Sequence, residues 1–324
     1  MPSDHMKTSS GFSHQKLIDT RSLTKDEIQI VFSQADQNKE TLSKFGMFID
    51  PKTPISGTKV IGLLFFEPST RTRLSFQMAS YRLGFQALVL ENAQSSSLAK
   101  GESITDTILN IVAMGPDALV VRYGVAPEVD ELLPSLSLPV INAGSGVHSH
   151  PTQALLDAYT MKCEFGSTEG LRVLIVGDLR HSRVAHSNFD VLEKLGVEVG
   201  VCGPEGMMPD FAEFPNLTFF EDLEEGIRWA DIYMGLRVQV ERHQSMMPSF
   251  SMDSYHAQFG LTLKRLQLLR NKSKAVIMHP GPVLRGFEFA DEVMQDLNCR
   301  VLDQVSNGVL IRGALLSLML SKND

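Results

Sequence analysis

Runs of apolar residues alternate along the chain with polar loops and with segments of helical periodicity. Before residue 150, four apolar runs predict buried strands: 59–66, 85–90, 117–122 and 138–144. The stretch RLSFQMASYRLG, which follows the first run, predicts a helix that ends at Gly84. Continuous apolar strands that alternate with helices imply a parallel sheet covered by helices on both faces.

A second series of the same kind follows the segment HPTQALLDAYTMKCEF at 150–165, which predicts a helix with Pro151 in its first turn. Later strands are predicted within 171–178, 197–203, 231–236 and 275–282, and later helices at 186–196, 221–230 and 307–320. Near the N-terminus, Thr24 and Glu27 fit a helix-capping box. We therefore predict an α/β protein of two domains, each a mostly parallel sheet flanked by helices, with the boundary near residue 149.

The composition is that of a globular protein with a sizeable core. The chain has 324 residues, of which 43% are hydrophobic and 21% charged, and no apolar run is as long as a membrane-spanning helix. Residues 1–15 are polar and lack the apolar centre of a signal peptide, so a cytoplasmic location is expected. The net charge of −8 argues against a nucleic-acid partner, since such proteins carry a basic patch.

Three cysteines, Cys163, Cys202 and Cys299, are spaced too far apart to predict a disulfide framework or a zinc ribbon. We expect them to be buried and unreactive. The pairs His148 with His150 and His181 with His186 lack the HExxH spacing and a set of carboxylates, so no metal site is predicted. No GxSxG nucleophile motif is present either.

Cations and hydroxyl groups gather where the predicted strands end. In open parallel sheets, ligands bind beyond the carboxyl ends of the strands. The polar residues at these ends are Ser69, Thr70, Arg71, Thr72, Arg73, Ser95, Ser96, Ser97, Lys100, Arg122, His148, His150, Gln153, Arg180, His181, Arg183, Arg237, Gln239, Arg242, His279 and Arg285. In an acidic chain, this concentration of positive charge predicts a site for a small anion that carries several charges.

The stretch FFEPSTRTRLSF at 65–76 joins a predicted strand to a predicted helix. Free backbone N–H groups at a helix N-terminus bind phosphate, and Arg71 can hold two oxygens at once. The spacing fits equally well a Ser/Thr helix cap followed by solvated arginines. Arginines at a helix start run against the dipole preference for acidic residues, which favours a bound anion.

The segment VHSHPTQ places His150 and Gln153 one helical turn apart on one face. They form either a donor pair directed at a carbonyl oxygen or, as the residues alone favour, ordinary packing at a helix start. The segment 244–255 is interpreted as a surface loop, with a binding lid as the alternative.

Several of these motifs resemble those of the carbamoyltransferases. FFEPSTRTRLSF is similar to the carbamoyl phosphate motif of that family, and HPTQALLD to its second motif. MGLRVQVERH at 234–243 and MHPGPVLRG at 278–286 resemble the members that use aspartate. The members that use ornithine carry HCLP in place of residues 279–282 and an SMG loop in place of 237–239. The resemblance extends from residue 65 to 288.

This resemblance implies transfer of a carbamoyl group from carbamoyl phosphate to the amine of L-aspartate, an early step of de novo pyrimidine (UMP) biosynthesis, with no metal or organic cofactor. The residues it implies for carbamoyl phosphate are Ser69, Thr70, Arg71, Thr72, Arg122, His150, Gln153, Gly281 and Pro282. Those for aspartate are Lys100, Arg183, Arg237 and Gln239. Catalytic roles are implied for Arg71, Thr72, Lys100, Arg122 and His150.

The resemblance also implies an organisation. Residues 1–149 form a carbamoyl phosphate-binding domain on which a final helix at 303–324 packs back, and residues 150–302 form an aspartate-binding domain. The expected assembly is a homotrimer in which Ser96 and Lys100 reach a neighbouring subunit. Association with regulatory or dihydroorotase-like chains is left open.

Two alternatives remain from the sequence. One is a transcarbamoylase with another acceptor such as ornithine, which is disfavoured because a cationic side chain would meet Arg237. The other is a non-catalytic anion-binding paralogue, which would have no need of His150 or Lys100.

Overall fold

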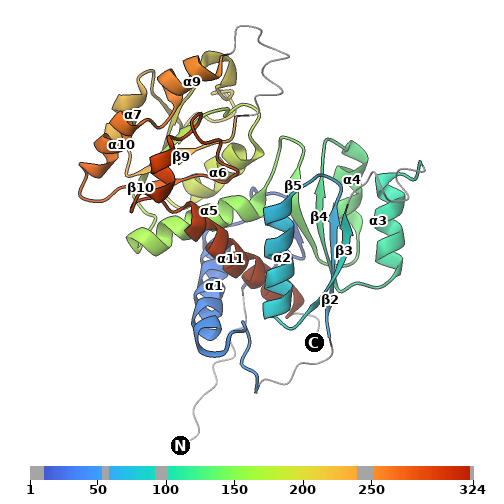
Figure 1. Ribbon diagram of the computed structural model, residues 1–324. Helices are drawn as coiled ribbons and strands as arrows, with labels where there is room; N and C mark the ends of the chain where they lie inside the picture. The colour runs from blue at the N-terminus through green and yellow to red at the C-terminus, as the bar shows by residue number, and fades with distance from the viewer. Residues whose placement is uncertain (1–10, 53–57, 92–100, 239–250, 322–324) are drawn as a thin grey trace, which may run out of the picture. The chain divides into compact units, whose positions relative to one another are not determined.

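The computed structural model describes residues 11–52, 58–91, 101–238 and 251–321 (Figure 1). Its contacts divide the chain into two compact units, each described by itself below. The first unit consists of Met1–Ile18, Ser22–Ala143 and Val309–Asp324, and the second of Asp19–Arg21 and Gly144–Gly308.

The first unit is built on a five-stranded sheet with the order β1-β5-β4-β2-β3. The strands are β1 (Lys16–Leu17), β2 (Val60–Phe65), β3 (Gln86–Glu91), β4 (Ala118–Tyr123) and β5 (Val140–Ser145). Strand β2 pairs in parallel with β3 on one side and with β4 on the other. The chain therefore changes direction across the sheet at β2.

Helices cover both faces of this sheet. They are α1 (Lys25–Phe45), α2 (Thr70–Arg82), α3 (Ile104–Ala113) and α4 (Pro127–Ser135). Figure 1 shows α2 on one side of the sheet and α3 and α4 on the other. Leu64, Leu119 and Val121 of the strands pack in one core cluster with Ile108 of α3 and Val129 of α4. Apolar strands covered in this way explain why the strand runs lack alternation.

The last helix, α11 (Val301–Leu320), contributes its residues from 309 onward to the first unit. There the buried Arg312 donates from Nη1 to Ser75 Oγ of α2 at 2.8 Å and lies over the ring of Phe76. Asn38 of α1 donates to the Leu310 carbonyl at 3.2 Å. These contacts attach both α1 and α2 to the C-terminal part of the chain.

The second unit contains another five-stranded sheet, with the order β10-β9-β6-β7-β8. Its strands are β6 (Arg172–Val176), β7 (Glu198–Cys202), β8 (Thr218–Phe219), β9 (Ile232–Gly235) and β10 (Val276–Met278). The helices are α5 (Pro151–Phe165), α6 (Arg183–Lys194), α7 (Leu223–Trp229), α9 (Met252–Phe259), α10 (Leu263–Arg270) and residues 301–308 of α11, with short 3-10 turns η3 (Glu205–Met207) and η4 (Asp291–Gln295). Strand β6 pairs in parallel with both β7 and β9, so this sheet too reverses its order beside β6.

The predicted fold class is confirmed by these two parallel sheets with helical layers. The segment 244–255 differs from a continuous loop, because Met252–Phe259 forms α9, capped by Ser251, whose side chain accepts from Ser254 N; residues 244–250 lie outside the described part. The expectation of three buried cysteines is confirmed for Cys202 but wrong for Cys163, which is exposed on α5, and for Cys299, which is only partly buried. Burial raises the pKa of the Cys202 thiol to about 12. Among the described residues, no helix has the length and apolar character needed to cross a membrane.

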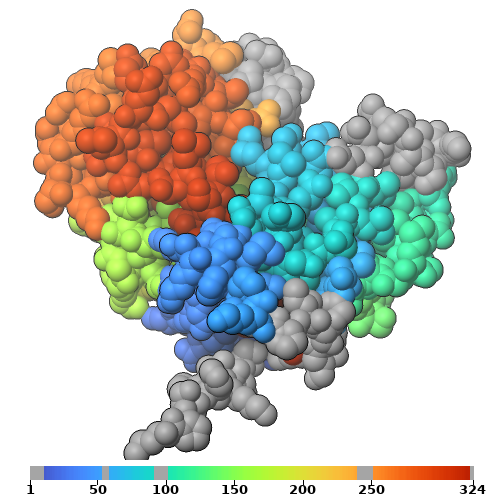
Figure 2. Space-filling model, turned by 60° about the horizontal axis from the view of Figure 1, so that its bottom comes forward, coloured from blue at the N-terminus to red at the C-terminus, as the bar shows by residue number. Residues whose placement is uncertain are grey.

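The predicted capping box at the start of α1 is confirmed. Glu27 N donates to Thr24 Oγ1 at 3.2 Å, and Thr24 N donates to Glu27 Oε2 at 3.0 Å. His14 Nε2 lies 3.1 Å from Glu27 Oε1, which ties the preceding segment to the helix. Burial alone would raise the pKa of Glu27, but the hydrogen bonds from Thr24 and His14 lower it to about 2. The blue surface of Figure 2 is the segment that contains this helix.

Replacing Glu27 with glutamine is expected to lower the free energy of unfolding by about 1 kcal/mol at neutral pH, the usual contribution of a helix cap. Because the folded pKa lies below the unfolded value near 4.5, the carboxylate stabilises the fold above that value and loses its effect as pH falls toward 2. Urea unfolding of wild type and Glu27→Gln between pH 3 and 7 checks this. A stability difference that does not shrink with falling pH would contradict it.

Candidate active site

The first group of predicted site residues lies at the carboxyl ends of β2 and β4. Phe65 is paired with Arg122 in the ladder between these strands, and Phe66 N donates to the Arg122 carbonyl at 2.8 Å. The chain leaves β2 toward α2, so the segment 66–72 begins beside Arg122. This is the point at which the strand order reverses, where open α/β sheets bind their ligands.

The start of α2 has the features of an anion site. Ser69 occupies the N-cap position, but its side chain makes no capping hydrogen bond, and the first turn of the helix contains no acidic residue. Arg71 is exposed, whereas Thr72 is buried. The interpretation of Ser69 as a side-chain helix cap is therefore not supported by a hydrogen bond. The positive end of the helix dipole lies beside an arginine, which favours a bound anion.

Arg122 is held in a defined orientation. Its Nη1 donates to the Ala143 carbonyl at 3.1 Å, and its Nη2 lies 3.7 Å from Glu67 Oε2. The side chain is only 12% exposed. A guanidinium fixed by two partners from different strand ends loses little further freedom when it binds an oxygen.

A second group lies at the matching position of the other sheet. Val176 at the end of β6 is paired with Gly235 at the end of β9. Arg183 is the first residue of α6, where Ser182 caps the helix, and its Nη1 donates to the Gly146 carbonyl at 3.0 Å. Arg237 lies two residues after the end of β9 and is exposed. The second unit thus also presents arginines at the reversal of its strand order.

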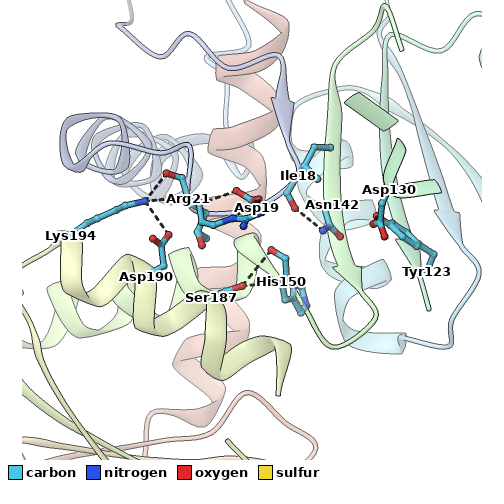
Figure 3. A network of polar contacts seen from close by, with 12 residues as sticks. Ile18, Asp19, Arg21, Tyr123, Asp130, Asn142, His150, Ser187, Asp190 and Lys194 are labelled. Atoms are coloured by element: carbon cyan, nitrogen blue, oxygen red, sulfur yellow. Dashed lines mark hydrogen bonds and ion pairs between the residues drawn. The ribbon is translucent and has the colours of Figure 1, made fainter. Parts of the chain in front are cut away.

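His150 and Gln153 lie at the start of α5 and are buried. The backbone N–H of His150 donates to Ser187 Oγ of α6 at 2.9 Å, a contact drawn in Figure 3. Gln153 donates through Nε2 to Asp157 Oδ1 at 2.9 Å. Since its amide nitrogen faces Asp157, Gln153 presents its carbonyl oxygen, which differs from the donor role suggested by the sequence.

The turn after β10 is organised by a buried histidine and a buried glutamate. Gly281 N donates to His279 Nδ1 at 2.9 Å, so this nitrogen is unprotonated, and His279 Nε2 lies 3.0 Å from Glu288 Oε2. Glu288 also accepts from Val238 N at 2.7 Å and from Leu284 N at 2.8 Å. One carboxylate therefore joins the turn that carries Gly281 and Pro282 to the loop that carries Arg237.

The candidate residues that lie outside the described part of the chain are Ser95, Ser96, Ser97, Lys100, Gln239 and Arg242. The structure brings Ser69, Thr70, Arg71, Thr72 and Arg122 together in the first unit, and places His150, Gln153, Gly281, Pro282, Arg183 and Arg237 in the second. His181 instead contacts Asp178, at 3.0 Å. Within the described residues, no group of three or more His, Cys, Asp or Glu side chains is arranged to hold a metal ion.

Sequence reasoning missed the residues that hold these groups in place: Glu67, Asp157, Ser187, Glu288 and Gln304. Asp157 lies inside the HPTQALLD motif, and its apolar surroundings gave the one available indication that a buried carboxylate needs partners.

Replacing Glu288 with alanine is expected to lower the free energy of unfolding by about 3 kcal/mol or more, because buried N–H donors lose their acceptor. Glu292→Ala, at an exposed position, is the matched control and should change stability little. Urea unfolding of both variants measures the difference. Equal stabilities would show that Glu288 does not organise this region.

Comparison with known proteins gives matches along almost the whole chain. Residues 15–163 match the family model described as the carbamoyl-P binding domain of aspartate/ornithine carbamoyltransferase, and residues 169–319 match the model of its Asp/Orn binding domain. The aspartate carbamoyltransferase catalytic subunit of Geotalea daltonii is 41% identical over 307 residues, which cover 94% of this chain and 96% of that protein.

Solved structures agree with the fold. Aspartate transcarbamoylase from Trypanosoma cruzi, in complex with carbamoyl phosphate, is 26% identical with a TM-score of 0.84, covering 95% of this chain and 96% of that one. Ornithine carbamoyltransferase from Thermus thermophilus is 27% identical with a TM-score of 0.79, covering 95% and 99%. Both acceptor types share the architecture, so the fold alone does not distinguish aspartate from ornithine.

Proposed function

Because the chain belongs to the aspartate/ornithine carbamoyltransferase family, we propose that it transfers the carbamoyl group of carbamoyl phosphate to the amine of L-aspartate. The products are N-carbamoyl-L-aspartate and phosphate. The observation that carries this proposal is the placement of an arginine group at the strand-order reversal of each sheet, one beside a helix start without acidic residues and one in the loop that follows β9. Two anionic substrates require two such groups.

We assign the phosphate of carbamoyl phosphate to the domain of residues 1–149 with the final helix, and aspartate to residues 150–302. In this assignment Ser69, Thr70, Arg71 and Thr72 bind the phosphate. Arg122, His150 and Gln153 bind the carbamoyl end, whose NH2 group also donates to the backbone carbonyls of Gly281 and Pro282. Arg183 and Arg237 bind the aspartate carboxylates, together with Lys100 and Gln239.

The chemistry follows from these donors. The aspartate amine attacks the carbamoyl carbon, a C–N bond forms, and the bond from that carbon to the phosphate oxygen breaks. The nitrogen loses one proton, which the departing phosphate accepts. Negative charge develops on the carbamoyl oxygen, and Thr72, Arg122 and His150 are the donors assigned to it. No covalent intermediate with the protein is required. Holding two reactants in line supplies roughly 7–11 kcal/mol of the barrier reduction at best.

Aspartate is favoured over ornithine on electrostatic grounds. The loop after β9 carries the exposed Arg237, and Arg183 opens α6 with no acidic residue in its first turn. A carboxylate pairs with such guanidinium groups, whereas a side-chain ammonium is repelled.

The acceptor is tested by assaying the purified chain with carbamoyl phosphate and either aspartate or ornithine. We expect a carbamoylated product with aspartate and none with ornithine. Arg237→Ala is expected to weaken aspartate binding by at least tenfold while leaving carbamoyl phosphate binding near normal, since a charge-assisted pair contributes about 1.5–3 kcal/mol. Arg71→Ala is the reciprocal variant and should lose carbamoyl phosphate binding instead. Calorimetry with each ligand distinguishes them, and equal losses for both ligands would contradict the two-group assignment.

We also propose that the chain functions as a homotrimer with sites shared between subunits. Leu74, Met78 and Tyr81 lie on one face of α2 and are 51%, 44% and 65% exposed. This apolar strip begins one turn after Arg71, in a helix whose opposite side packs on the sheet. A second copy that covers the strip would lie next to the phosphate end, which supports the assignment of Lys100 to a neighbouring site.

The shared site is tested by mixing two inactive variants. Lys100→Ala and Arg71→Ala are each expected to be nearly inactive alone. After dissociation, mixing and reassembly, roughly a quarter of the sites in a closed ring combine an intact Arg71 with an intact Lys100 from the neighbour, and activity returns in proportion. Native mass spectrometry confirms that mixed oligomers have formed. If they form without recovered activity, each site lies within one chain.

A further inference from the structure

Asp157 is a fully buried carboxylate in the second unit, one turn along α5 from Gln153. Three side-chain amides donate to it. Gln153 Nε2 and Gln304 Nε2 reach Oδ1 at 2.9 and 2.8 Å, and Asn188 Nδ2 reaches Oδ2 at 3.0 Å. These amides come from α5, α11 and α6, so the carboxylate lies where three helices of one unit meet.

The carboxylate determines how each amide is turned. An ionised carboxylate only accepts hydrogen bonds, so each amide must direct its NH2 group toward Asp157 and its oxygen elsewhere. For Gln304 the result is visible, because its Oε1 accepts from the backbone N–H of His279 at 2.8 Å. The same rule turns the oxygen of Gln153 away from Asp157.

We propose that Asp157 is a positioning residue that makes Gln153 a hydrogen-bond acceptor for the carbamoyl NH2 group and, through Gln304, fixes the backbone at His279. The inference rests on the proposed function, because it names a role within that site. Without Asp157 the amide of Gln153 can rotate and offer either end, so the site loses its preference for a ligand that donates at this position.

The preference can be measured with a ligand pair that differs only there. Acetyl phosphate carries a methyl group in place of the NH2 group of carbamoyl phosphate and cannot donate. We expect wild type to bind carbamoyl phosphate more tightly than acetyl phosphate in calorimetry. In Asp157→Ala this ratio of dissociation constants should fall by roughly tenfold, the equivalent of one hydrogen bond. If the alanine variant does not fold, Asp157→Ser is used, since its hydroxyl is too short to reach Gln153.

Two further variants separate positioning from simple loss of structure. Asp157→Asn keeps one oxygen that can face both Gln153 and Gln304, so it should retain most of the ratio. Asn307→Ala removes another buried contact between α11 and α5, the 3.0 Å bond from Asn307 Nδ2 to Thr160 Oγ1, without touching Asp157. It should leave the ratio unchanged even where it lowers stability.

The outcomes are distinct. A ratio that collapses in Asp157→Ala and survives in Asp157→Asn and Asn307→Ala supports the inference. Equal weakening of both ligands in Asp157→Ala, or an unchanged ratio, overturns it while leaving the proposed reaction intact. Failure of wild type to bind carbamoyl phosphate or to carbamoylate aspartate would instead overturn the proposed function, and the inference with it.

Discussion

The pairing of a central strand with neighbours on both sides is the constraint on which each unit depends. Strand β2 is flanked by β3 and β4, and strand β6 by β7 and β9, all in parallel. Parallel pairing aligns the carboxyl ends of these strands, and the reversal of order leaves a gap between the loops that follow them. Arg122 lies opposite Phe65 for this reason, and Arg237 lies two residues after Gly235, the partner of Val176.

The second consequence is electrostatic. The chain carries a net charge of −8, yet the first turns of α2 and α6 contain no acidic residue. An arginine at a helix start is unfavourable with respect to the helix dipole. Helix α1 differs, because the acidic residues Asp26 and Glu27 occupy its first turn and interact favourably with the dipole. The first turns of α5 and α10 also contain no acidic residue. What distinguishes α2 and α6 is an arginine beside a reversal of strand order, and this is the basis for proposing an anion at each of them.

Much of this follows from local sequence. The strands are continuous apolar runs, the capping box at Thr24 is a fixed spacing, and the STRTR segment directly follows a strand. The missed features depend on partners far apart in the chain: Asp157 meets Gln304, and Glu288 meets Val238. The hydrophobic periodicity of the sequence carries no information about such contacts. Helix α9 was missed because its eight residues are rich in polar side chains and follow a proline-containing stretch, so their packing, with Tyr255 buried against Phe287, had to come from the fold.

The charged residues of the candidate site are of two kinds, which have different roles. Arg71 and Arg237, the proposed ligand-binding residues, are exposed, whereas Asp157 and Glu288 are buried and accept hydrogen bonds from amide and backbone donors. A buried carboxylate without such donors would be strongly destabilising, so each one obliges its surroundings to adopt a single arrangement. His279 connects the surroundings of the two carboxylates. Its backbone N–H donates to Gln304, a partner of Asp157, and its ring contacts Glu288. These hydrogen bonds hold the surroundings of Asp157 and Glu288 in one arrangement, which reduces the binding energy that a ligand would spend on ordering them.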